Sequence, residues 1–452
     1  MAAAMQKQLT RLAAPFAAMF FAGLASLLAA PAQAVPAYAS QTGQNCNACH
    51  VGGFGPQLTP FGRRFKDGGY TLRTNTFNVP LSVMAVASYV RTRKAQDPPP
   101  TPDFSSNDNL ALDQISVFLA GGWGQHLGAF VQTTYDGIGK RFTWDNLDLR
   151  ATTKVTLAGH GVQLGASLNN SPTITDPFNT LKAWGYPYTS SSLAPSPGAQ
   201  PIIGSFAQTT LGLTGYAVLD SGLRLEAGGY QTPGGSLLRR LGSDPTSPGI
   251  LARTAPYARI AYEKDLGDSN FEVGVFGLWA NLYPGGDRSA GTSDRYADTG
   301  VDASYQWFRS NKDVFTLNGR FTHESRTQTA SQALGLAQFG PGRLDDLRLD
   351  ASYFWRNKIG ATVGLFDTTG TSDNLIYGGN RTFKPDSSGA TFQVDGTPWG
   401  AGDSGLGRRF NARLGVQYTV YGKFDGARND YDGAGHNASD NNTLRLFAWF
   451  AY

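Results

Sequence analysis

The sequence of 452 residues predicts an all-β protein, a transmembrane antiparallel β-barrel of about 16 strands. From about Val79 to Tyr452, apolar and polar side chains alternate in short stretches that Gly, Asp, Asn, Ser and Pro separate, and a period of two is typical of β-strands. The candidate strands are about ten residues long, which is the length that a tilted strand needs to cross the hydrocarbon. Short connections alternate with long polar ones, as in outer-membrane barrels.

The composition excludes several other classes of protein. The 38 basic and 34 acidic side chains leave a net charge of +4, which is too balanced for a nucleic-acid-binding face. Aromatic residues make up 12% of the chain, which argues against disorder. The two cysteines lie three residues apart and cannot form a disulfide framework. A helical membrane protein is excluded as well, because the one apolar run of sufficient length lies at the extreme N-terminus.

That N-terminal run has the features of an export signal. Lys7 and Arg11 precede the apolar residues 12–30, and Ala32-Gln33-Ala34 is a small-x-small cleavage pattern. We therefore expect residues 1–34 to be a cleaved signal peptide and the mature chain to start at Val35. An uncleaved membrane anchor is the alternative, since the run is long for a signal peptide. In both cases the rest of the chain crosses the inner membrane.

The next feature is Cys46-Asn47-Ala48-Cys49-His50, which has the spacing for covalent attachment of one c-type haem. The thiols of Cys46 and Cys49 add to vinyl groups, and His50 is the axial ligand of the iron. A thioredoxin-like Cys-x-x-Cys would need a βαβ context, and a zinc site would need more ligands nearby. The motif therefore predicts haem c as the cofactor.

Residues 35–78 are predicted to form a small monohaem cytochrome c domain, and residues 79–452 the porin-like barrel. So short a domain buries too little surface to be stable without a covalent cross-link or a bound group, and covalently attached haem supplies both. Its many Pro and Gly residues leave little room for long helices. Because a domain of this size is too small to enclose a haem in solution, we expect it to lie in the barrel as a plug.

In the barrel, each candidate strand has one apolar and one polar face, and a soluble all-β secreted protein is the alternative to a membrane barrel. Examples of such strands are 301–307, 315–321, 347–353 and 416–420. Aromatic residues near strand ends favour an interfacial girdle: Trp279, Trp307, Tyr353, Trp355 and Tyr418. The aromatic end at Tyr452 is similar to the terminal strand of outer-membrane proteins.

The connections indicate which end of each strand faces the periplasm. Brief turns are expected at 154–160, 220–222, 264–269, 309–313 and 356–358. Long polar outer loops are expected near 95–109, 170–204, 231–253, 283–296, 324–343, 368–387 and 422–441. An even number of strands returns both ends of the barrel to the periplasm.

The second axial ligand of the haem iron is not fixed by a motif. Met84 is the only methionine after the signal peptide, and alternation along 80–89 turns it toward the lumen. A thioether ligand would raise the potential relative to a second imidazole. Met84 as a packing residue is the alternative role, with His126 and His160 as second-choice ligands. The remaining histidines, His323 and His436, are expected in solvated positions at the outer side.

Ten charged residues are expected to face the lumen as a ladder of ion pairs that anchors the N-terminal domain: Asp148, Arg150, Arg224, Glu226, Asp302, Arg320, Arg348, Asp350, Arg413 and Arg445. An Fe(II) site among the carboxylates fits the preference of this cation for oxygen ligands, but the spacing singles out none.

The stretches 35–43 and 56–70, on both sides of the haem motif, resemble the fused monohaem cytochrome-porins of the bacterial outer membrane. The best known members are the outer-membrane Fe(II)-oxidising cytochromes. The resemblance covers the whole mature chain, and 437–444 is similar to the ending of the family. One departure is Ser40, where the family is expected to have an arginine, so a role for that arginine at a haem propionate does not carry over.

The resemblance implies electron transfer, with Fe(II) oxidase activity, from extracellular Fe(II) through the haem to a periplasmic c-type cytochrome. It also implies contact with outer-membrane lipid. The balanced charge indicates no nucleic-acid partner. The alternatives are a conduit for another extracellular donor or acceptor, and a porin in which the haem domain is a structural plug. No hydrolase or nucleotide-binding pattern competes with these functions.

Overall fold

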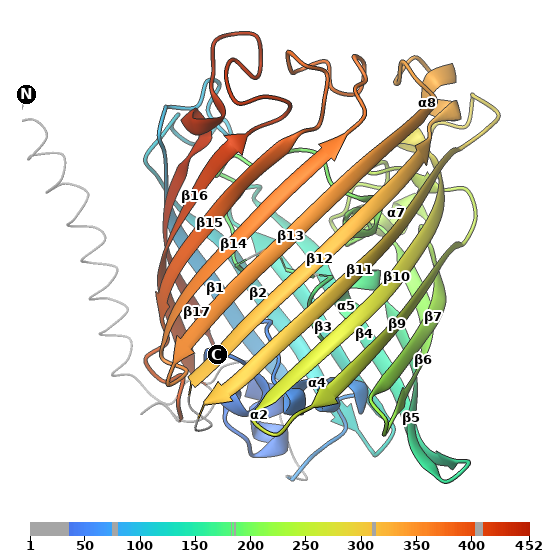
Figure 1. Ribbon diagram of the computed structural model, residues 1–452, viewed down its shortest axis with the longest axis vertical. Coiled ribbons are helices and arrows are strands. Elements are labelled where there is room, and N and C mark those ends of the chain that lie inside the picture. The colour runs from blue at the N-terminus through green and yellow to red at the C-terminus, as the bar shows by residue number, and fades with distance from the viewer. Residues whose placement is uncertain (1–35, 75–79, 182, 185–186, 310–312, 403–409) are drawn as a thin grey trace, which may run out of the picture.

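The computed structural model describes residues 36–74, 80–181, 183–184, 187–309, 313–402 and 410–452, and the predicted signal peptide lies outside these residues. The described strands form one antiparallel sheet that closes on itself, because β1 (Leu81–Thr92) pairs with both β2 (Asn109–Trp123) and β17 (Thr443–Ala451) (Figure 1). The other long strands are β3 (Leu127–Asp136), β4 (Arg141–Leu157), β5 (His160–Asn169), β6 (Leu211–Leu219), β7 (Leu223–Gln231), β9 (Ala255–Asp265), β10 (Ser269–Tyr283), β11 (Asp294–Arg309), β12 (Asp313–Thr327), β13 (Pro341–Trp355), β14 (Ile359–Gly370), β15 (Ser387–Gly396) and β16 (Asn411–Lys423).

This part of the chain therefore has sixteen long strands, as predicted, and a two-residue strand, β8 (Ile250–Leu251), that pairs with the outer end of β10. Among the described residues, no helix combines the length and the apolar character needed to cross a bilayer. The helices are α2 (Pro36–Thr42), α3 (Cys46–Cys49), α4 (Pro60–Asp67), α5 (Pro172–Thr175), α6 (Ile202–Ser205), α7 (Gly235–Arg240), α8 (Thr329–Ala333), and the 3-10 turns η1 (Pro284–Gly286) and η2 (Ala438–Asn441).

The two faces of the strands confirm a membrane barrel rather than a soluble one. In β1, the side chains of Leu81 and Val83 are 52% and 39% exposed on the outer surface, whereas Ser82 and Met84 are buried on the inner side. Apolar side chains are exposed in the same way along the other long strands. An apolar outer surface belongs in lipid, and the closed sheet leaves no strand edge with unpaired backbone groups.

Short and long connections lie at opposite ends of the barrel (Figure 1). The short turns lie at the end that also holds α2 and α4, which we assign to the periplasmic side. The turn predicted at 154–160 is shorter than expected, because Val155 pairs with Val162 and Thr156 with Gly161, which extends β4 and β5. The resulting turn consists of Ala158 and Gly159.

The connection between β5 and β6, residues 170–210, corrects the prediction of an outer loop at 170–204. It folds into the lumen, and we call its described residues the inner loop. Ile174 and Leu181 are almost completely buried there. The inner loop is attached to the wall through α6, where the Ile202 amide donates to Glu324 at 2.6 Å and the Ile203 amide to Asp298 at 2.8 Å. These carboxylates of the barrel wall thus accept hydrogen bonds from backbone amides of the inner loop. The alternation of side chains along a strand does not reveal these partners.

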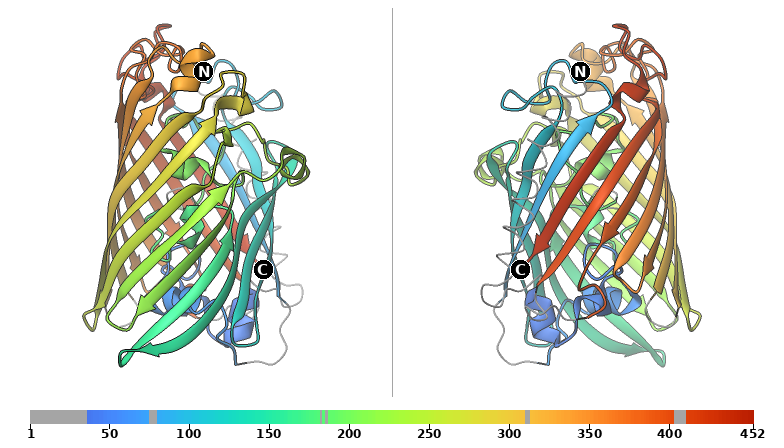
Figure 2. Two further views of the ribbon diagram at one scale, coloured as in Figure 1. Left: turned by 90° about the vertical axis from the view of Figure 1, so that its right-hand side faces the viewer. Right: turned by 90° about the vertical axis from the view of Figure 1, so that its left-hand side faces the viewer.

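Residues 36–74, the N-terminal segment, occupy the lumen at the periplasmic end, below the inner loop (Figure 2). Tyr38 Oη donates to the carbonyl of Ala129 on β3 at 2.7 Å. The Gly122 amide on β2 donates to Gln41 Oε1 at 2.8 Å. The inner loop and the N-terminal segment therefore both lie inside the barrel.

Candidate haem site

The Cys-x-x-Cys-His motif forms one helical turn followed by an extended residue. The amide of His50 donates to the carbonyl of Cys46 at 2.9 Å, which closes the turn of α3. His50 itself is extended, with φ −121° and ψ 138°. Residues three apart on one helical turn project to the same side, so Cys46 and Cys49 present their thiols together. Both cysteines are half-buried, and no disulfide joins them.

The chain after His50 turns back and packs against α3. The Val51 amide donates to the Gln57 carbonyl and the Thr59 amide to the Cys49 carbonyl, both at 2.9 Å. Thr59 also caps α4, since its Oγ1 accepts from the Gly62 amide at 3.2 Å. A Cβ on Gly62 would lie only 2.3 Å from the Cys49 carbonyl oxygen, so this close approach requires glycine.

A cavity of about 1240 Å³ of atom-free space, including its mouth, opens beside the motif. Cys46, Cys49, His50 and Met84, the four predicted cofactor residues, all line it. Most of the other walls are apolar and aromatic, and they come from three sources: the N-terminal segment (Phe54, Leu58, Phe65), the inner loop (Ile174, Pro177, Trp184) and the barrel wall (Phe118, Phe130, Trp449).

Met84 faces the lumen, as the alternation of β1 predicted. Its side chain is 6% exposed and belongs to an apolar cluster with Phe54 and Trp449, against which Cys46 packs. The structure places Met84 in the same cavity as His50, and its role as a ligand of the iron stays a prediction.

The other histidines are outside this cavity. His126, whose Nδ1 lies 2.8 Å from the Thr152 carbonyl oxygen, and His160 lie at periplasmic turns, as expected. His436 lies in an outer connection, with Nδ1 2.5 Å from Asp432. His323 is solvated as expected, with its side chain 43% exposed, but it lies on β12 rather than in a loop, and its Nδ1 is 2.6 Å from Asp345.

The two side chains that would react or ligate are neutral in this environment. Burial lowers the pKa of His50 to about 4, and a contact with the Gly55 carbonyl only partly opposes that shift. Nδ1 of His50 is buried without a hydrogen-bond partner of standard geometry. Burial raises the pKa of Cys49 to about 12, with a smaller contribution from Cys46. The thiol is therefore unlike the low-pKa thiolate of a redox-active or zinc-binding cysteine.

These observations fit a covalently attached haem. The cavity is large and mostly apolar, the thiols of Cys46 and Cys49 stand at one wall, and the neutral imidazole of His50 faces the same space. A porphyrin is a flat apolar group with an iron that binds neutral imidazole and thioether ligands. The residues present would hold such a group without a buried charge at either axial position.

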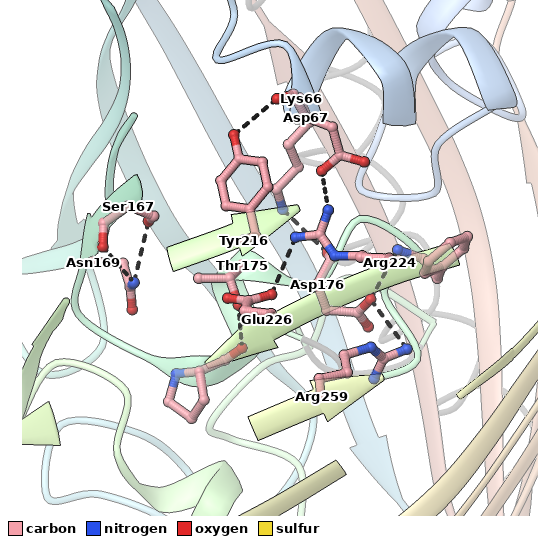
Figure 3. A network of polar contacts seen from close by, with 12 residues as sticks. Lys66, Asp67, Ser167, Asn169, Thr175, Asp176, Tyr216, Arg224, Glu226 and Arg259 are labelled. Carbon is pink, nitrogen blue, oxygen red and sulfur yellow. Dashed lines mark hydrogen bonds and ion pairs between the residues drawn. The ribbon is translucent and has the colours of Figure 1, made fainter. Parts of the chain in front are cut away.

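The N-terminal segment is held by polar contacts with many strands. Arg63 donates to Glu263 at 2.7 Å and to Asn270 at 2.6 Å. Asp67 forms an ion pair with Arg224, and its carbonyl accepts from Tyr216 Oη at 2.8 Å (Figure 3). Burial of ion pairs costs desolvation, which additional hydrogen bonds offset, so their arrangement fixes the position of the segment more than it adds stability.

The predicted ladder of lumen charges is present, but its residues bind two parts of the chain, the N-terminal segment and the inner loop. Asp148, Arg150, Arg224 and Arg413 bind the N-terminal segment, for example through the bond from Tyr70 Oη to Asp148 at 2.6 Å. Three others bind the inner loop: Asp302, Arg320 and Arg445. The remaining three pair with other residues of the barrel wall: Glu226, Arg348 and Asp350.

Sequence reasoning missed the contribution of the inner loop to the cavity. A long polar connection between two strands does not reveal whether it folds outward or inward. A weaker signal was available in the wall, where Phe118, Phe130 and Trp449 occupy inward positions that are normally polar. Within the described residues, no group of three or more His, Cys, Asp or Glu residues is placed to hold a metal ion.

No protein-family model matches the chain, and no curated protein matches it either. Several solved outer-membrane proteins have a similar fold. OprB of Pseudomonas putida, solved at high pH, is 11% identical with a TM-score of 0.49, and the match covers 82% of this chain and 93% of OprB. Salmonella typhi OmpF in complex with daunomycin is 14% identical with a TM-score of 0.48, and the match covers 86% of this chain and 99% of OmpF. These likenesses concern the porin-like barrel alone.

Proposed function

We propose that this chain is an outer-membrane electron-transfer protein that takes electrons from extracellular Fe(II), through a c-type haem, to a periplasmic cytochrome. The observation that carries the proposal is the cavity in the lumen where Cys46, Cys49, His50 and Met84 meet. When bound there, a c-type haem supplies one-electron exchange at its iron.

Each of the four residues has a defined task. Cys46 and Cys49 hold the group through thioether bonds, in which each S–H adds across a vinyl double bond and no atom leaves. His50 offers a neutral imidazole nitrogen as the axial ligand, and Met84 is the proposed second ligand. A thioether in that position raises the reduction potential, which suits the acceptance of electrons from Fe(II).

The surroundings of the cavity favour the transfer of electrons over the passage of ions. Ile174 and Trp184 of the inner loop line the cavity, together with residues of the N-terminal segment. The helices α2 and α4 of that segment lie at the periplasmic end of the barrel. The net reaction is balanced, because each extracellular Fe(II) becomes Fe(III) and one periplasmic ferric cytochrome becomes ferrous. The insoluble ferric product then stays outside the cell.

The proposal is tested with anaerobic proteoliposomes in which the long loops face outward. External Fe(II) should reduce the haem, which is followed by its absorbance, and should do so faster than in liposomes that carry the haemless Cys49→Ala variant. Haem reduction by a small organic reductant but not by Fe(II) would contradict iron as the substrate. It would leave a conduit for another extracellular donor or acceptor as the function.

A porin with a structural plug is the second candidate. It is favoured by the porin-like barrel and by a second cavity of about 2800 Å³ of atom-free space, open to solvent, beside α4 at the periplasmic mouth. Charged and polar side chains such as Arg64, Lys154 and Asp220 line this cavity. A conductance in planar bilayers comparable to that of an open channel would favour the porin, whereas an electron conduit should pass few ions.

A further inference from the structure

We propose that Lys66 and Asn179 form the subsite that binds a propionate carboxylate of the haem, so that the inner loop completes the cofactor site. This inference rests on the haem of the proposed function and assigns residues to its anionic edge. A carboxylate removed from water needs donors, and an ammonium and an amide N–H are both suitable.

Lys66 brings a buried positive charge to the cavity. Its side chain extends from α4, and its Nζ donates to the inner-loop carbonyls of Ile174 at 2.5 Å and Asp176 at 3.1 Å (Figure 3). An ammonium has three N–H donors, so two carbonyl acceptors leave one donor for a ligand. Among the described residues that line the cavity, Lys66 is the only Lys or Arg.

Asn179 brings a donor from the inner loop to the same cavity. Its residue is 4% exposed, and its Nδ2 is buried near the hydroxyl of Tyr188 without a hydrogen-bond partner of standard geometry. A buried amide nitrogen that lacks a well-formed hydrogen bond is costly, and Asn179 lines the cavity in which an acceptor would complete its bonding. The backbone at Asn179 has φ 56°, a left-handed conformation that asparagine tolerates well.

The nearby negative charge does not compete for these donors. Asp176 is the only acidic side chain among the described lining residues. Its carboxylate accepts from the amides of Phe178 at 3.0 Å and Leu181 at 2.9 Å and lies 3.6 Å from Arg259. Lys66 donates to the carbonyl of Asp176 and not to its carboxylate. The carboxylates of Asp67, Asp148 and Asp176 act on the ammonium electrostatically, so one N–H donor stays available to an anion.

The experiment compares full-length Lys66→Gln and Asn179→Gly with the wild type, with Lys264→Gln as the control. Glycine keeps the positive φ of residue 179, and Lys264 is an exposed lysine that lines the second cavity, not the haem cavity. Haem staining first establishes that each protein carries the cofactor. The readouts are then the propionate bending band in resonance Raman spectra and the midpoint potential of the haem.

Both variants should shift the propionate band, and the control should not. The oxidised haem carries one more positive charge than the reduced haem, so removal of a nearby positive charge stabilises the oxidised state relative to the reduced one. Lys66→Gln should therefore lower the equilibrium constant for reduction about tenfold, which is 59 mV for a one-electron couple. Haem-loaded variants with the band and potential of the wild type would overturn the subsite. A wild type without haem stain would instead overturn the proposed function, so the two failures are distinguishable.

Discussion

The guanidinium of Arg413, on β16, donates to the carbonyl oxygen of Phe54 at 2.6 Å. The same Nη2 donates to the Gly52 carbonyl at 2.9 Å, and Nε lies 3.4 Å from Asp395. These bonds tie the residues directly after His50 to a strand from the other end of the chain. The position of His50 therefore depends on assembly of the whole barrel.

We predict that Arg413→Ala will weaken this attachment. Breaking a buried pair and leaving Asp395 uncompensated should cost about 3–5 kcal/mol of stability, and less haem should be attached per folded barrel. Denaturant unfolding and haem stain per barrel band measure the two effects. Arg348→Ala is the matched control, because Arg348 pairs with Asp346 on the wall and does not bind the N-terminal segment. Equal haem content in both variants would contradict the anchoring role.

Cys49→Ala should abolish haem staining on a denaturing gel. With one thiol removed, the covalent attachment that survives denaturation is lost, and the N-terminal segment loses the cross-link that stabilises it. The amount of folded barrel should fall as well, as measured by heat-modifiable mobility. An unstained wild-type protein, expressed with a cytochrome c maturation system, would refute the cytochrome interpretation.

Met84→Ala should change the coordination of the haem iron. Loss of a thioether ligand leaves the iron with one protein ligand, so the reduced spectrum should become high-spin and the potential should fall. Met84→Leu is a control for packing in the apolar cluster with Phe54 and Trp449. Leucine has nearly the volume of methionine but no thioether, so this variant should show the same spectral change without the loss of packing that alanine causes. Wild-type spectra in both variants would refute Met84 as a ligand of the iron.

The wild-type barrel should conduct poorly, and Arg259→Met should increase its conductance. Nη2 of Arg259 contacts Asp302 at 2.6 Å and Glu272 at 3.0 Å on the wall and lies 3.6 Å from Asp176 on the inner loop. Without this cation, three buried carboxylates face one another, and the inner loop should leave the wall. Single-channel recordings in planar bilayers test this, again with Arg348→Ala as the control. A wild-type conductance that the substitution does not change would contradict a loop that closes the lumen.

The sequence determined the features that depend on neighbours along the chain. Alternation with a period of two assigned Ser82 and Met84 to the lumen and Leu81 and Val83 to lipid, because successive side chains of a strand point to opposite faces. The motif at Cys46 determined the candidate cofactor in the same way, because the spacing within one helical turn decides which side chains lie together.

Only the tertiary structure decided which distant residues share the cavity. The inner loop contains no local signal for folding inward, since its position depends on partners such as Glu324 and Asp298 that lie on other strands. Lys66 and Asn179 meet at one cavity because barrel closure brings α4 and the inner loop together within the same lumen. The physical reason is that hydrogen bonds and charges are satisfied by proximity in space, whereas a sequence pattern records only proximity along the chain.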